Sequence, residues 1–87
     1  MKMEQNPIYK KIDEILWFDW DPIGVNIFED ARDEYWGYLP LIFRLKINGA
    51  GEDEIAKTLH KIETDNMGLS GDFEHCRVIS QKILEIE

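Results

Sequence analysis

The carboxylates are the side chains of this sequence that are best suited to chemistry. Asp19 and Asp21 lie at the predicted end of one helix, and Asp30, Asp33 and Glu34 lie at the predicted start of the next. Facing carboxylates in a helical bundle can hold Mg²⁺, as they do in helical nucleotide pyrophosphohydrolases. Those enzymes pair E-x-x-E with E-x-x-D, and here only Asp30-x-x-Asp33 approximates half of that pattern. A magnesium-dependent hydrolase that uses these carboxylates is therefore kept as an alternative to a function in binding. We assign no catalytic residue, cofactor or metal ligand.

The remaining reactive side chains favour structural roles. Nucleophilic catalysis needs a nucleophile beside a positioned base, but Cys76 lies on an apolar helix face and His75 points about a hundred degrees away. His60 and Glu63 are three residues apart and could share a metal with His75, yet no H-E-x-x-H or paired-cysteine motif supports such a site. We expect a buried packing thiol, two surface histidines and a protein that is not an enzyme.

The charge of the chain is concentrated in one segment. The formal net charge is −8, and residues 13–36, called the acidic segment below, hold eight acidic residues and one basic residue, Arg32. An acidic field repels phosphate backbones, so it disfavours nucleic-acid binding. A basic protein partner, a cation or simple solubility would each suit this charge.

All three tryptophans lie in the same acidic segment. Trp20 continues the apolar stripe of the first helix, so we expect it in the core with its indole N–H bonded to a carboxylate or carbonyl. Trp17 and Trp36 fall beside the stripes of their helices, and we expect both to be partly exposed among the acids. Aromatic anchors surrounded by charge are typical of binding hot spots. Core packing of all three tryptophans is the open alternative.

Two helical regions are predicted to position the acidic segment. Asn6 and Pro7 form a helix-start signal, and the helix they open runs to about Phe18, before Asp21-Pro22 ends it. The apolar residues of the connector 23–28 are expected to pack under the loop. A second helix is predicted from residue 29 or 30 to residue 47, kinked or broken near Gly37–Pro40.

Two further helices complete the predicted fold. The third opens at residues 52–54 and closes at Gly68 in a left-handed cap, and Ser70 or Asp72 caps the fourth. The fourth helix has a regular apolar face, formed by Phe73, Cys76, Ile79, Ile83 and Ile86. No alternating segment predicts a strand. We expect one domain, residues 1–87, folded as a compact all-α bundle of about four helices.

The composition favours a cytoplasmic location. The single cysteine excludes an internal disulfide framework and fits a reducing compartment. No basic region precedes an apolar one at the start of the sequence, so a signal peptide is not indicated. The longest apolar runs, such as residues 39–43, are too short to span a bilayer.

Three stretches of the sequence resemble those of a known family. The run W-D-P-I-G-V at residues 20–25 is similar to a box in a family of small, uncharacterised bacterial proteins, a domain of unknown function. Residues 31–40, A-R-D-E-Y…Y-L-P, and residues 54–69, E-I-A…I-E-T…M-G-L, are similar to further stretches of that family. The resemblance covers most of the chain and implies a small helical bundle, with no activity attached.

The leading hypothesis from the sequence is a small acidic protein-binding module. Its concrete form is an immunity-like or antitoxin-like inhibitor of a basic partner such as a nuclease toxin, whose cationic surface the acidic segment would attract. Tyr35, like Trp17 and Trp36, would supply contact area at low entropy cost. The expected interface therefore has seven residues: Trp17, Asp21, Asp30, Asp33, Glu34, Tyr35 and Trp36. A structural homodimer is a further alternative, and the sequence leaves the oligomeric state open.

Overall fold

The first helix begins and ends close to the predicted positions. In the computed structural model, which describes residues 5–87, α1 spans Pro7–Glu14 and continues into a π-helical turn, η2, at Ile15–Trp20. Residues 1–4 of the predicted domain lie outside this description. The Asn6 side chain accepts a hydrogen bond of 2.8 Å from the Ile8 N–H and so caps the helix. Asp21 ends it in the left-handed region, with φ of 32°.

The predicted second helix is broken before Pro40. Between residues 21 and 38 the chain forms turns and one 3₁₀ turn, η3, at Glu29–Ala31, and α2 spans only Leu39–Ile47. The predicted break near Gly37–Pro40 is confirmed, whereas a regular helix before it is wrong. Hydrogen bonds between residues three apart run through this stretch, including Trp36 N–H to the Asp33 carbonyl. Pro40 explains the break, because it has no N–H to continue a helical ladder from residue 36.

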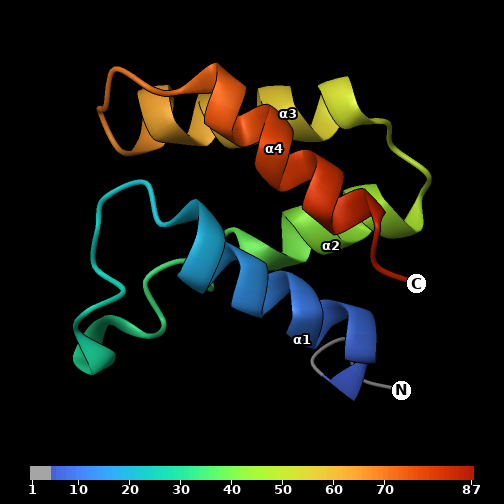
Figure 1. Ribbon diagram of the computed structural model, residues 1–87, viewed down its shortest axis with the longest axis horizontal. Helices are drawn as coiled ribbons and strands as arrows, with labels where there is room; N and C mark the ends of the chain where they lie inside the picture. Colours follow the sequence, from blue (N-terminus) through green and yellow to red (C-terminus); the bar gives the residue numbers. More distant parts are fainter. Residues whose placement is uncertain (1–4) are drawn as a thin grey trace.

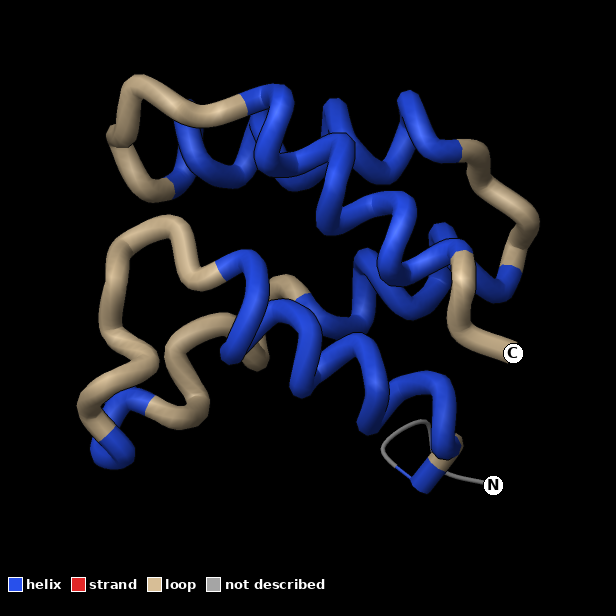
Figure 2. Tube along the Cα trace, in the orientation of Figure 1, coloured by secondary structure: helices blue, strands red, loops and turns tan. Residues whose placement is uncertain are grey.

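The last two helices form an antiparallel pair. α3 spans Glu52–Lys61 and continues into a π-helical turn, η4, at Ile62–Asn66, and α4 spans Phe73–Leu84. Gly68 adopts the predicted left-handed conformation, with φ of 69°. Asp72 is the N-cap of α4, since its carboxylate accepts a hydrogen bond of 3.1 Å from the His75 N–H. Figures 1 and 2 show α3 and α4 side by side, with α1 and α2 packed below them.

The core lies between these two helix pairs and confirms the predicted all-α bundle. Its apolar residues are each less than a tenth exposed: Ile12, Leu16, Trp17, Trp20, Tyr35, Leu39, Ile42, Ile55, Ala56, Leu59, Ile62, Cys76, Ile79 and Ile83. Two polar residues, Glu63 and Ser80, are buried as well. No strand occurs within residues 5–87. In the same part of the chain, no helix combines the length and the apolar character needed to cross a bilayer.

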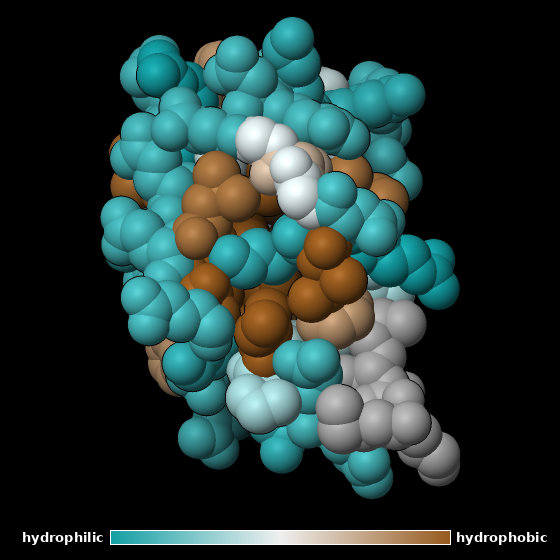
Figure 3. All heavy atoms as spheres, turned by 90° about the vertical axis from the view of Figure 1, so that its right-hand side faces the viewer, coloured by the Kyte–Doolittle hydropathy of each residue, from teal (hydrophilic) through white to brown (hydrophobic). Residues whose placement is uncertain are grey.

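The end of the bundle farthest from the loop of residues 21–38 is closed by Lys46. Its Nζ donates to the carbonyls of Leu84 at 3.1 Å and Ile86 at 2.8 Å, where the last carbonyls of α4 lack partners within the helix. Figure 3 shows apolar side chains gathered at the centre of this end and ringed by polar ones. Ile47, the last residue of α2, is 52% exposed.

Candidate binding surface on the acidic segment

Trp17 lies in the core, which corrects the expectation that it is partly exposed. Only 3% of its surface is accessible. The expectation assumed an α-helical turn, whereas η2 is a π-helix, whose wider i→i+5 turn rotates the following side chains. The Arg32 guanidinium carbon also covers the indole, 5.3 Å from the ring centroid. Trp17 therefore supports the surface from below and does not form part of it.

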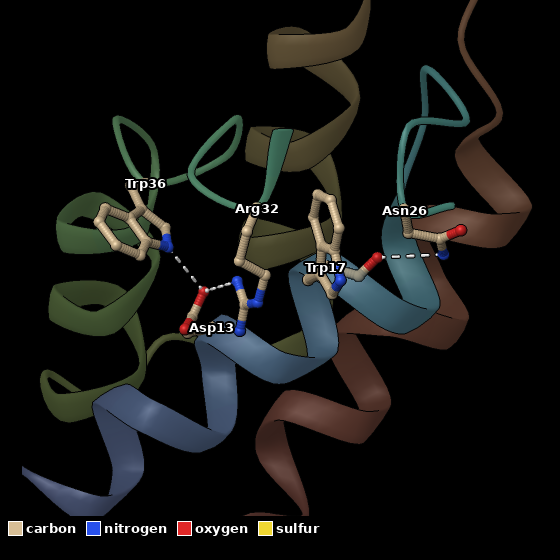
Figure 4. Close-up of polar contacts among 5 residues, drawn as sticks. All are labelled: Asp13, Trp17, Asn26, Arg32 and Trp36. Carbon is tan, nitrogen blue, oxygen red and sulfur yellow. Dashed lines mark hydrogen bonds and ion pairs between the residues drawn. The ribbon is translucent and has the colours of Figure 1, made fainter. Parts of the chain in front are cut away.

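Asp13 organises the residues around Arg32, as Figure 4 shows. Its two carboxylate oxygens accept from the guanidinium at 2.8 and 2.9 Å, a bidentate ion pair. The Trp36 indole N–H also donates to Asp13, at 3.1 Å. Trp36 is 52% exposed, as predicted. The single basic residue of the acidic segment is thus neutralised internally, and one aromatic ring is held at the surface beside it.

Asp21 and Tyr35 form a hydrogen-bonded clamp within the chain, and the burial of Tyr35 contradicts the contact role that the sequence suggested for it. The Tyr35 hydroxyl donates to Asp21 at 2.6 Å, and the same carboxylate accepts from the N–H groups of Val25 at 2.8 Å and Asn26 at 3.3 Å. Tyr35 is only 2% exposed, and burial together with the Asp21 carboxylate raises the pKa of its phenol. Short aspartates often bond to backbone N–H groups a few residues on, so this carboxylate is used within the chain.

Asp30, Asp33 and Glu34 are exposed, in agreement with the sequence-based interface. Glu14 and Glu29 are exposed in the same acidic segment. Within residues 5–87 none of these five carboxylates takes part in an ion pair. Asp19 differs from them, because Lys82 of α4 lies 3.5 Å away. The acidic segment therefore presents a group of uncompensated negative charges to solvent.

Three large apolar side chains project beside these acids, and the sequence interpretation missed them. Phe18 is 63% exposed, Ile27 79% and Phe28 57%. The prediction that the connector packs its apolar residues underneath is wrong for Ile27 and Phe28. Polar groups hold this loop, because Asp21 binds its backbone and the Asn26 side chain donates to the Trp17 and Phe18 carbonyls at 3.2 and 3.3 Å. The sequence signal that could have predicted this exposed loop was the spacing of Asp21 and Asn26, two polar residues able to bond to nearby backbone groups.

Glu63 joins the start of α4 to the end of η2. This carboxylate is only 2% exposed, and it accepts from the Trp20 indole N–H and from the Asp72 N–H, each at 2.9 Å. The predicted burial of Trp20 and the predicted bond to a carboxylate are both confirmed. His75 adds to the junction, with its Nε2 2.9 Å from the Asp19 carbonyl oxygen.

A pocket of about 450 Å³ opens at this junction. Trp20, Asp21, Glu63, Asp72 and His75 are among its lining residues. Both oxygens of Glu63 already have partners within the chain. His60 is edge-on to the Phe73 ring, with 5.6 Å between the ring centroids, and it is not among the residues that line the pocket. In the described part of the chain, no three His, Cys, Asp or Glu side chains converge in a way that could hold a metal ion.

Cys76 is a buried thiol, as predicted, with no accessible surface. Burial raises its pKa from the ordinary 9.0 to about 12, and the nearby negative charge of Glu63 acts in the same direction. The unfolded thiol therefore ionises above pH 9 while the folded one stays protonated. This difference does not affect stability below pH 9 and lowers it as the pH rises from 9 toward 12.

We expect the free energy of unfolding to fall above pH 9 by up to about 1.4 kcal/mol per pH unit from Cys76 alone. Urea unfolding, followed by tryptophan fluorescence at pH values from about 8 to about 11, measures how steeply the free energy of unfolding falls with pH. The Cys76→Ala variant should show a shallower slope over the same range. An unchanged slope would mean that other groups, such as Tyr35, carry the alkaline sensitivity.

Comparison with protein-family models, with curated proteins and with solved structures gave no match to the chain. The resemblance of residues 20–25, 31–40 and 54–69 to a family of small bacterial proteins stays a prediction. Function is therefore inferred from the geometry of residues 5–87 alone.

Proposed function

We propose that this chain is a small acidic protein-binding module that inhibits a basic partner by occlusion, in the manner of an immunity protein or antitoxin. One observation supports the proposal above others: exposed carboxylates without ion pairs stand beside exposed large apolar side chains. The carboxylates are Glu14, Glu29, Asp30, Asp33 and Glu34, and the apolar side chains are Phe18, Ile27, Phe28 and Trp36. Exposed apolar groups rimmed by charge are the usual composition of a protein-binding surface.

The two kinds of side chain have different roles in this proposal. Uncompensated carboxylates attract a cationic surface over a distance of about 10 Å at 0.1 M salt and raise the rate of association. They take the places of the phosphates that a nuclease partner would bind through its Lys and Arg side chains. The apolar side chains exclude water at the contact and slow dissociation. Inhibition then requires only that the partner's substrate surface is covered, and no chemical step.

Neutralising Asp30 and Asp33 tests this proposal. We expect the Asp30→Asn/Asp33→Asn double variant, used as immobilised bait on cell extract of the source organism at low salt, to retain far less of the partner than the wild type does. Two lost charges should lower the association rate about tenfold. Retention by the wild type should itself disappear near 0.5 M salt, where the screening length falls below about 5 Å. Mass spectrometry identifies the retained protein, and biolayer interferometry measures its rates.

The Asp53→Asn/Glu54→Gln double variant is the matched control. It removes two exposed acids from the first turn of α3, outside the acidic segment, and should retain the partner as the wild type does. Equal loss in both variants, or no retained basic protein at low salt, would contradict the proposal. Light scattering separates the homodimer alternative, because self-association of an acidic surface should strengthen as salt screens the repulsion.

A further inference from the structure

Phe18, Ile27 and Phe28 are the three most exposed large apolar side chains of the described chain, and we call them the anchor cluster. Each is more than half exposed, and Ile27, at 79%, is the most exposed of the large apolar residues. Single exposed apolar residues are normal on protein surfaces, but a local group of them marks an interaction site. Hydrogen bonds from the Asn26 side chain to the Trp17 and Phe18 carbonyls hold Asn26, which directly precedes Ile27 and Phe28 in the chain, against the backbone of η2.

The anchor cluster is presented by a fixed loop. Asp21 accepts from the N–H groups of Val25 and Asn26, and the Phe28 N–H donates to the Val25 carbonyl at 2.9 Å. The Tyr35 hydroxyl donates at 2.6 Å to Oδ1 of Asp21, the same oxygen that accepts from Val25, while Oδ2 accepts from Asn26. A loop held in this way loses little conformational entropy when it binds. The exposed apolar side chains of this loop are therefore preorganised for binding.

A recess beside the anchor cluster has the chemistry to accept a cationic side chain. It has a volume of about 360 Å³ and is lined by Trp17, Phe18, Asn26, Glu29 and Arg32. Arg32 is neutralised by Asp13 in a bidentate pair, whereas the Glu29 carboxylate has no ion pair with any residue from 5 to 87. The exposed Phe18 ring next to the Glu29 carboxylate suits the long apolar stem and charged end of Lys or Arg, whereas the face of Trp17 is already covered by Arg32.

We propose that the anchor cluster binds a basic amphipathic helix of the partner, an inference that rests on the proposed function and names the element recognised. The apolar stripe of that helix contacts Phe18, Ile27 and Phe28, and a flanking Lys or Arg enters the recess to pair with Glu29. A strand-like ligand is disfavoured, because residues 5–87 contain no sheet edge to which it could add. A second copy is disfavoured by the like charges of Glu29, Asp30 and Asp33.

Two synthetic peptides of identical Lys and Leu content provide the probe. In one, Leu recurs at i, i+3, i+4 and i+7 to give an amphipathic helix, and in the other the order is scrambled. We expect the amphipathic peptide to bind about tenfold more tightly or better in calorimetric titrations at low salt. In NMR titrations of the isotope-labelled protein, its largest shifts should fall on residues 17–30.

Phe18→Ser and Ile27→Ser should each weaken the amphipathic peptide about tenfold and leave the scrambled peptide unchanged. Ile47→Ser is the matched control, because it removes an equally apolar side chain, 52% exposed, from the last residue of α2. Figure 1 shows this end of α2 on the side of the bundle away from the loop of residues 21–38. Each replaced side chain is already in solvent, so thermal melting should show all three variants folded.

The outcomes separate this inference from the proposed function. Suppose that the two peptides bind the wild type with equal affinity and that the Asp30→Asn/Asp33→Asn variant binds neither. This result would support an acidic binding module and would overturn the role of the anchor cluster. Shifts centred on α2, or a greater effect of Ile47→Ser than of Ile27→Ser, would also overturn it. If neither peptide binds at low salt, both the inference and the proposed function fail.

Discussion

Replacing Glu63 by alanine is expected to destabilise the fold by about 3–5 kcal/mol, a large part of the 5–15 kcal/mol typical of a folded domain. The carboxylate is buried and accepts hydrogen bonds from Trp20 and from the Asp72 backbone. Its removal leaves two buried or half-buried N–H groups without partners and opens a cavity beneath α4. Urea unfolding followed by tryptophan fluorescence measures the loss, and the melting temperature should fall by about 12 °C or more.

Two further variants identify the source of that loss. Glu63→Gln keeps the volume but turns an amide NH₂ toward one of the two donors, so about half of the effect should remain. Trp20→Phe removes the indole N–H, and in a double-mutant cycle its cost should be smaller when residue 63 is already glutamine. Strictly additive losses would contradict a direct Trp20–Glu63 bond and assign the destabilisation of Glu63→Ala to the cavity alone.

Local rules explain why the helices and the core could be predicted from the sequence. Asn6-Pro7 and Asp72 are helix-start signals whose side chains bond to N–H groups only two or three residues on. Gly68 ends a helix because its left-handed conformation costs glycine nothing. The buried stripe of α4 follows from the 3.6-residue period. Each of these features depends on neighbours within one or two turns of the same helix.

The errors arose where distant polar groups determine the backbone. Trp17 was expected near the surface because the π-helical turn of η2, which has no clear sequence signal, changes the direction of its side chain. Glu63 was considered only as a ligand on a helix surface, although it accepts from Trp20, 43 residues away in the chain. A single sequence does not reveal such pairing, since it depends on how η2, η4 and α4 meet.

The sequence predicted the acidic residues of the candidate surface and the exposure of Trp36, but it missed Phe18, Ile27 and Phe28. Acidic residues without partners stay in water on any fold, so Asp30, Asp33 and Glu34 could be assigned from composition alone. An apolar residue carries the opposite expectation, and Ile27 and Phe28 were therefore placed under the loop. Their exposure follows from Asp21 and Asn26, which satisfy the loop's polar groups and allow it to stand away from the core.

Replacing Asp21 by alanine should cost about 2–4 kcal/mol and disorder the loop that carries the anchor cluster. The carboxylate accepts from Val25, Asn26 and Tyr35, and a hydrogen bond to a charged group contributes about 1.5–3 kcal/mol net. The total for three bonds is reduced here, because Asp21 is only half-buried and water can take the place of the lost carboxylate. Alanine also fits poorly at the positive φ of this position. Hydrogen exchange should accelerate at the Val25 and Asn26 amides, and the amphipathic peptide should bind more weakly although Phe18, Ile27 and Phe28 are unchanged.

Two further variants, Asp21→Asn and Asp33→Ala, show whether the loop is held by the hydrogen bonds of Asp21 or by the negative charge of the acidic segment. Asparagine tolerates the left-handed conformation and keeps one acceptor oxygen, so Asp21→Asn should lose less than half as much stability as Asp21→Ala. Asp33→Ala removes an equal charge from an exposed side chain without an ion pair, and it should leave both stability and the two amides unchanged. If Asp33→Ala accelerates exchange at Val25 as much as Asp21→Ala does, the loop is held by the charge of the whole segment and not by the Asp21 carboxylate.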